Sequence, residues 1–203
     1  MSLASGGSSR IVNEPQMKIL LWNCRGCNSP EFRQSFKDLI EWNKPSIVCL
    51  TETHIQSHYD LIGFVNLTDL SEISTDGYSS GASLMWKQEE LTTDLVATTD
   101  QEIHVNIQVR GTSHIWLLSL VYASTDLANR SILLNNLETI ARNHTLLWLL
   151  CGDFNEVTSA SEKFGGRPIN NTRANTFIQC LNNLDMIDLG FKGPGSRGQI
   201  KGK

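Results

Sequence analysis

Long apolar runs are absent from this sequence of 203 residues. No stretch approaches the roughly 20 consecutive apolar residues that cross a bilayer. The segment from Met1 to Arg10 is small and polar, so it lacks the apolar core of a secretory signal. These absences predict an intracellular protein with no membrane partner, and they do not distinguish the nucleus from the cytoplasm.

Cysteine is sparse and odd in number, with five residues in all. Cys49, Cys151 and Cys180 lie in apolar patterns, and nothing resembles a disulfide framework. Cys24 and Cys27 form a Cys-x-x-Cys motif, but no second pair or histidine cluster stands nearby. A zinc site is therefore not expected there, and ordinary packing or a free thiol is the interpretation of this pair.

A surplus of positive charge is also missing, because the formal net charge is −4 at pH 7. This argues against a protein that holds nucleic acid mainly by neutralising phosphates. A metal-dependent nuclease needs less positive charge of its own, because a divalent ion supplies positive charge at the phosphate. A local basic rim of Arg25, Lys163, Arg167 and Arg173 would add to it. Weak, transient binding of any nucleic acid is the expectation.

The composition is that of one globular domain, with 40% hydrophobic and 19% charged residues. Residues 1–16 are expected to be a flexible leader, because they contain a Gly-Gly-Ser-Ser stretch and no periodicity. The folded domain is expected over residues 17–193. Residues 194–203 are Gly-rich, basic and aperiodic, which predicts a disordered tail.

The first part of the domain has the pattern of a strand–helix–strand unit, from Met17 to Glu52. Apolar strands over residues 18–22 and 46–50 flank a helix that begins at Ser29-Pro30-Glu31, where a capping hydroxyl precedes a proline and an acid. Such a connection predicts two parallel strands.

The middle of the chain predicts mainly strands. Between His54 and Ser80 the pattern is polar, and no element is assigned there. An antiparallel meander is then expected from strands over residues 81–86, 91–97, 103–109 and 115–122. The alternation over residues 103–109 predicts one buried and one solvated face.

Two further helices are expected around a last apolar strand. Asp126 is placed to cap a helix that leads into the strand over residues 146–151. After a loop over residues 161–171, a second helix presents Ala174, Phe177, Ile178, Leu181 and Leu184 on one face.

Three apolar strands each end in polar side chains. Asn23 follows the first strand, Glu52 the second, and Asp153 and Asn155 the last. Ligands of open α/β sheets bind at the carboxyl ends of strands, and strand alternation places Asp153 and Asn155 on one side. An acid and an amide on one face suit a metal-bound phosphate. Each residue alone could be a turn former or a solvated strand end, but the ordered set favours a functional site.

Taken together, Asn23, Glu52, Tyr122 and Gly152-Asp153-Phe154-Asn155 resemble the endonuclease/exonuclease/phosphatase superfamily. The likeness is greatest to the endonuclease domains of plant LINE-type (non-LTR) retrotransposons, and it covers Met17 to about Gly193. The segments that carry this closer likeness are residues 20–26, 49–53 and 161–167. The resemblance implies an α/β fold, a deoxyribonuclease-like four-layer sandwich of two mixed β-sheets flanked by helices.

The resemblance also implies roles for these residues. Glu52 resembles the metal ligand, with Asn23 beside it. Asp153 resembles the residue that orients or deprotonates the attacking water, Asn155 the residue that positions the scissile phosphate, and Tyr122 a phosphate contact. The implied metal is Mg²⁺, with Mn²⁺ as an alternative, because such hard cations prefer carboxylate oxygen. Tyr122 is also consistent with a packed tyrosine whose hydroxyl is satisfied.

The implied activity is hydrolysis of phosphate esters, ancestrally the nicking of DNA, which makes DNA the expected, weakly bound substrate. The superfamily also has a later Ser-Asp-His element, and no Asp-His pair occurs in this sequence. We therefore expect a domain that is truncated, lacks its C-terminal strands and has little or no activity. The alternatives are a non-catalytic remnant or binding module of the same fold and a phosphomonoesterase. No protein partner can be inferred.

Overall fold

The computed structural model describes residues 17–74, 81–156 and 170–189. The expected leader over residues 1–16 and tail over residues 194–203 lie outside these ranges. In chain order the elements are β1 (Ile19–Asn23), α1 (Pro30–Asn43), β2 (Ile47–Thr51), α2 (Tyr59–Phe64), β3 (Asp69–Ile73), β4 (Ala82–Trp86), β5 (Leu91–Thr98), β6 (Glu102–Val109), β7 (Ile115–Tyr122), α3 (Leu127–Asn143), β8 (Leu147–Asp153) and α4 (Asn171–Asn183). In the described ranges no helix is both long and apolar enough to cross a membrane.

The strands form two mixed sheets of four strands each. In the first sheet, ordered β1-β2-β4-β3, β1 and β2 are parallel and β4 is antiparallel to both of its neighbours. In the second, ordered β5-β6-β7-β8, the first three strands are antiparallel and β8 runs parallel to β7. The predicted strand–helix–strand unit with parallel strands is confirmed.

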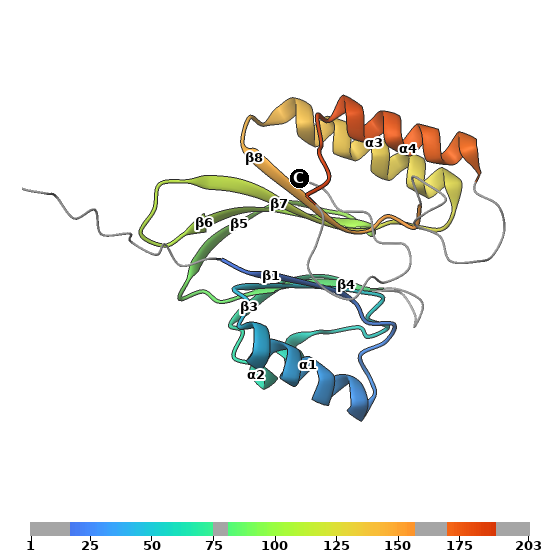
Figure 1. Cartoon of the computed structure of the whole chain (residues 1–203). Coiled ribbons are helices and arrows are strands. Elements are labelled where there is room, and N and C mark those ends of the chain that lie inside the picture. The colour runs from blue at the N-terminus through green and yellow to red at the C-terminus, as the bar shows by residue number, and fades with distance from the viewer. Residues whose placement is uncertain (1–16, 75–80, 157–169, 190–203) are drawn as a thin grey trace, which may run out of the picture.

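The sheets stack face to face, and helices cover their outer faces (Figure 1). Residues such as Leu84 and Leu118 fill the core between the sheets. A second core, around Phe36, lies between the first sheet and α1 and α2. A third, around Leu150 and Phe177, lies between the second sheet and α3 and α4. The four-layer sandwich implied by the resemblance is thus the observed fold.

Both predicted helix caps are present. The Ser29 hydroxyl accepts a hydrogen bond from the Phe32 amide at 3.0 Å, directly before Pro30. The Asp126 carboxylate accepts from the amides of Ala128 and Asn129 at 3.0 and 3.1 Å. These side chains satisfy backbone donors that have no partner within the first turn of a helix.

Two elements lie where none was assigned, since α2 and β3 occupy the polar region between His54 and Ser80. The helix has only six residues and no side-chain cap, so it leaves little periodic signal. The strand is an edge strand whose polar residues Ser71 and Glu72 are half-buried, and pairing with β4 holds it in place. Tertiary contacts override weak local preference in both cases.

The expected four-strand meander is wrong in one respect, because β4 belongs to the first sheet and only β5, β6 and β7 form a meander. The expected solvated face of β6 is also partly wrong. His104 on that face is buried and hydrogen-bonds the Ser119 hydroxyl at 2.5 Å. Asn136 of α3 reaches the same face and donates to Glu102 Oε1 at 2.7 Å. The helix α3 therefore covers the face of β6 that the alternation predicted to be solvent-exposed.

Candidate active site

The carboxyl ends of β1, β2 and β8 meet at one place, although these strands belong to two different sheets. Asn23 ends β1, Glu52 directly follows β2, and Asp153 ends β8. The Asn23 amide nitrogen donates to Glu52 Oε1 at 2.8 Å and to Asp153 Oδ2 at 2.7 Å. The structure therefore brings together three of the five predicted site residues through one side chain.

Tyr122 joins this group from the neighbouring strand. It ends β7 and lies opposite Asp153 in the parallel register of β7 and β8. Its side chain is half-buried, and burial together with the negative charges of Glu52 and Asp153 raises the pKa of Tyr122 to about 12. The phenol is therefore protonated at neutral pH and can act as a hydrogen-bond donor.

Asn155 is linked to the group through Asp153. Its backbone amide donates to Asp153 Oδ1 at 2.9 Å, and its side-chain nitrogen donates to the carbonyl of Ala123 at 2.6 Å. Asn155 has a left-handed backbone with φ of 49°, so the strand alternation that was expected to align it with Asp153 does not extend this far. A tight turn brings the two residues together instead.

Gly152 permits the close approach of β8 to β7 just before this turn. Its φ is 138°, and a Cβ atom there would lie 1.9 Å from the carbonyl oxygen of Val121. No residue with a side chain fits at this position without moving the backbone. Steric exclusion of a Cβ atom thus explains why glycine occupies the first position of the Gly-Asp-Phe-Asn motif.

The backbone around Glu52 is unusual and is held from several sides. Glu52 and His54 both have left-handed φ angles, of 54° and 55°. Between them, the Thr53 amide donates to the carbonyl of Gly81 at 3.2 Å, and the Thr53 carbonyl accepts from Cys27 at 2.8 Å. Left-handed conformations are costly for residues other than glycine, so these contacts stabilise the backbone that carries Glu52.

A buried chain of side chains supports the same turn. His58 is fully buried, and its two ring nitrogens lie 2.8 Å from Thr53 Oγ1 and 2.8 Å from Glu72 Oε2. Its backbone amide also donates to Glu72 Oε2 at 2.9 Å. Burial lowers the pKa of His58, although the charge of Glu72 opposes the shift. This support was not predicted, because it lies in the segment where no element was assigned.

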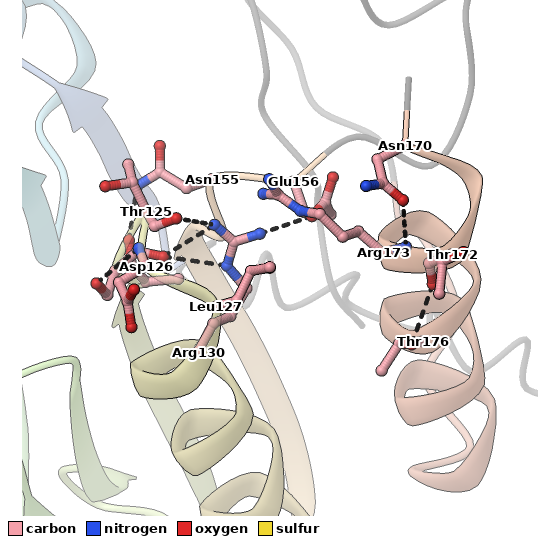
Figure 2. Close-up of polar contacts among 12 residues, drawn as sticks. Thr125, Asp126, Leu127, Arg130, Asn155, Glu156, Asn170, Thr172, Arg173 and Thr176 are labelled. Atoms are coloured by element: carbon pink, nitrogen blue, oxygen red, sulfur yellow. Dashed lines mark hydrogen bonds and ion pairs between the residues drawn. The ribbon is translucent and has the colours of Figure 1, made fainter. Parts of the chain in front are cut away.

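Arg130 connects the turns that follow β7 and β8 (Figure 2). Its guanidinium donates to the carbonyls of Ser124 and Thr125 at 3.0 and 3.2 Å, and to Glu156 Oε2 at 2.6 Å. Arg173 of α4 donates to the same carboxylate oxygen at 2.9 Å. The side chain of Arg130 is 6% exposed, so this is a buried ionic network one residue beyond Asn155. The only sequence signal was the position of Arg130 one turn before Leu133, on the buried face of α3.

Two carboxylates lie close together in this site, with little opposing charge. Burial raises the pKa of Asp153; the backbone amide of Asn155, the Asn23 side chain and the charge of Arg25 oppose this shift, and the charge of Glu52 adds to it. The Oδ1 atom of Asn23 is buried and has no hydrogen-bond partner within the described part of the chain. This donor set is rich in oxygen and negative charge, which fits a hard divalent cation.

The predicted basic rim is described only in part. Arg25 is exposed and has a left-handed φ of 53°. Arg173 pairs with Glu156, while Lys163 and Arg167 lie outside the described residues.

The described residues contain no cluster of three or more His, Cys, Asp or Glu side chains that could hold a metal ion. Two carboxylates and an amide suit Mg²⁺ better than Zn²⁺, because Mg²⁺ keeps several waters.

Comparison with known proteins agrees with this geometry. Residues 20–197 match the model of the endonuclease/exonuclease/phosphatase family. The chain belongs to this family. No curated protein matches the sequence.

Solved structures of other proteins share the family fold. The endonuclease domain of TRAS1, a telomere-specific non-LTR retrotransposon, has a TM-score of 0.69 at 16% identity, over 93% of this chain and 84% of that one. The AP endonuclease LMAP from Leishmania major has a TM-score of 0.66 at 13% identity, over 85% and 68%. The mannosyl-6-phosphatase Bt3783 from Bacteroides thetaiotaomicron has a TM-score of 0.55 at 12% identity, over 72% and 68%. At these identities the likeness is one of fold.

Proposed function

We propose that this member of the endonuclease/exonuclease/phosphatase family is a divalent-metal-dependent phosphodiester hydrolase that nicks DNA. The observation that carries the proposal is the pair of hydrogen bonds from one Asn23 amide to Glu52 and Asp153, at 2.8 and 2.7 Å. The two carboxylates, one from each sheet, are thereby held together at the carboxyl ends of the strands, which is where α/β folds bind ligands.

In this proposal Glu52, with Asn23 beside it, holds Mg²⁺, and Mn²⁺ is the alternative cation. The bound ion would polarise the phosphate and neutralise its charge. Glu52 suits the role because the Gly26 amide donates to its carbonyl at 2.7 Å and the next residue, Thr53, is held by Gly81 and Cys27. The buried side-chain oxygen Oδ1 of Asn23 has no hydrogen-bond donor within the described ranges and would be a further oxygen ligand.

Asp153, Asn155 and Tyr122 act on the water and the phosphate. Burial makes Asp153 a stronger base than an exposed carboxylate, which suits it to deprotonate or orient the attacking water. Asn155 uses one N–H to bind the carbonyl of Ala123, and its second N–H is left for a phosphate oxygen. Tyr122 keeps its proton at neutral pH and donates it as a hydrogen bond.

DNA is the proposed substrate, and a LINE-type element is the proposed origin. The support is the fold likeness to two endonucleases, one of them from a non-LTR retrotransposon, together with the resemblance of residues 20–26, 49–53 and 161–167 to plant LINE-type endonuclease domains. A net charge of −4 makes the binding weak. We expect slow turnover, because no histidine within the described residues hydrogen-bonds to Asn23, Glu52, Asp153 or Asn155. One missing donor in a preorganised site costs about 10²–10³ in rate.

The test is incubation of the purified chain with supercoiled plasmid and Mg²⁺. The proposal predicts slow formation of nicked circles that chelation stops and that Asp153→Ala and Glu52→Ala abolish. Equal nicking by these variants would show that a contaminant or another site is responsible. Hydrolysis of a phosphomonoester without nicking would assign the protein to the phosphomonoesterases. A cooperatively melting chain that hydrolyses neither substrate would be a non-catalytic remnant.

A further inference from the structure

The thiols of Cys24 and Cys27 face each other in the turn that follows β1. Their sulfur atoms lie 3.4 Å apart, and both cysteines are free. A disulfide bond is about 2.05 Å long, so the two sulfur atoms must approach each other by a little more than about 1 Å to form one. We infer that Cys24 and Cys27 form a redox-active dithiol, a site at which the chain is reversibly modified to an internal disulfide.

The backbone, rather than chance side-chain packing, sets this distance. The Cys24 amide donates to the carbonyl of Thr51 at 3.1 Å, and the Cys27 amide donates to that of Thr53 at 2.8 Å. Between them, Arg25 and Gly26 have φ angles of 53° and 110°, which close the chain into a tight turn. One end of the turn is therefore held by the last residue of β2 and the other by the turn that follows β2, and the two sulfur atoms lie 3.4 Å apart.

The two thiols differ in access. Cys27 is only 2% exposed, whereas Cys24 is partly exposed. An oxidant in solution therefore reaches Cys24 first, and Cys27 is the resolving thiol. The chain holds a natural comparison in Cys49 and Cys151, whose sulfur atoms lie 3.9 Å apart but are buried between the sheets. Proximity without access is not expected to give rapid exchange.

The chemistry balances with glutathione disulfide as the oxidant. The thiolate of Cys24 attacks one sulfur of glutathione disulfide, breaks its S–S bond and releases one glutathione thiolate. The thiolate of Cys27 then attacks the Cys24 sulfur, forms the internal disulfide and releases the second glutathione. Two protein thiols are oxidised, one glutathione disulfide is reduced to two glutathiones, and the protons of the thiols pass to the released thiolates.

The modification would act on the backbone that carries Glu52. In the reduced form the Cys24 thiol donates to the carbonyl of Thr51 at 3.2 Å and lies 3.8 Å from that of Glu52. A disulfide sulfur has no proton, so oxidation removes both interactions. The proposal does not rest on the proposed hydrolase activity, because its test reads out a covalent bond.

The experiment treats the folded, full-length reduced chain with glutathione disulfide, alkylates the remaining thiols and maps the products by mass spectrometry after trypsin cleavage. Trypsin cuts after Arg25, so the expected disulfide appears as two linked peptides that dithiothreitol separates. Cys49, Cys151 and Cys180 should be alkylated only after unfolding. A wild-type chain in which Cys24 and Cys27 are both alkylated once the glutathione disulfide has been removed and the chain unfolded would overturn the inference.

Single variants test the order of the steps. Cys27→Ser should accumulate a mixed disulfide between Cys24 and glutathione, whereas Cys24→Ser should leave Cys27 unmodified. Equal modification of the two variants would contradict the assignment of Cys24 as the first thiol. At a fixed glutathione ratio, the wild-type disulfide-to-dithiol ratio should be at least about tenfold larger in the native chain than in urea. Equal ratios would mean that sequence spacing, and not the fold, brings the thiols together.

Discussion

The amide nitrogen of Asn23 is shared by two carboxylates, Oε1 of Glu52 at 2.8 Å and Oδ2 of Asp153 at 2.7 Å. Glu52 directly follows β2 of the first sheet and Asp153 ends β8 of the second, so this side chain links the two halves of the sandwich at the site. Hydrogen bonds to charged groups are stronger than neutral ones, and these two also keep like charges together.

Removal of this amide should therefore destabilise the fold. Asn23→Leu keeps the side-chain size but leaves two carboxylates without their common donor, and we expect a loss of about 2 kcal/mol in the free energy of unfolding. The matched control is Asn183→Leu, because Asn183 donates to Glu138 at 3.4 Å in an exposed position. That variant should stay within about 0.5 kcal/mol of wild type. Urea denaturation at neutral pH measures both, and equal losses would contradict the prediction.

The raised pKa of Asp153 makes the stability of the metal-free chain depend on pH. The folded state binds this proton more tightly than the unfolded state, so stability falls as pH rises from roughly 3.9 through the raised folded pKa of Asp153, and stays lower above it. Asp153→Asn should lack this fall and be more stable than wild type at neutral pH. Denaturation over a pH series tests this. Asp94→Asn, at an exposed position on β5, should retain the wild-type pH dependence.

His58 should contribute stability with the opposite dependence on pH. Its pKa is lowered by burial, so its contribution is complete above the unfolded value of about 6.5 and is lost as pH falls from there through the folded pKa. His58→Ala leaves Thr53 and Glu72 without their partner and should cost about 2 kcal/mol or more at pH 7.5. The variant should lose less stability than wild type between pH 7 and pH 5. The exposed His114→Ala should match wild type in both measurements, and a wild-type curve that is flat over this interval would contradict the assignment.

The Arg130 network should be sensitive to the shape of the side chain as well as to its charge. Arg130→Lys keeps the charge but cannot span the carbonyls of Ser124 and Thr125 and the carboxylate of Glu156. We expect a loss of about 2–4 kcal/mol in thermal or urea unfolding. Arg142→Lys is the control, since the side chain of Arg142 is 71% exposed in its pair with Glu138, and such pairs contribute little. Similar effects of the two substitutions would show that the buried network does not hold the turns.

The elements that the sequence predicted correctly are those with a strong local signal. The caps at Ser29 and Asp126 and the parallel pairing of β1 with β2 follow from residues that are neighbours in the chain. The helix α2 and strand β3 could not be predicted, because a six-residue helix has no full periodic face and an edge strand is stabilised by its partner. The switch of sheets between β4 and β5 is likewise a long-range choice that local pattern does not encode.

The candidate site also combines residues with a local sequence signal and residues whose role depends on long-range contacts. Polar residues at strand ends identified Asn23, Glu52 and Asp153, and the structure joins them by hydrogen bonds. Their roles in catalysis stay predictions. The supports at His58 and Arg130 were missed, because a lone buried histidine and an arginine on an apolar helix face acquire meaning only through residues distant in sequence.

Calorimetric titration with Mg²⁺ tests whether Glu52, with Asn23 beside it, holds one divalent cation next to Asp153. We expect one bound ion per chain and a higher melting temperature with Mg²⁺. Glu52→Gln should lose this binding, while the exposed Glu41→Gln on α1 should bind as wild type does. A folded wild-type chain that takes up no Mg²⁺, or a Glu52→Gln variant that binds it equally well, would show that this strand edge is not a cation site.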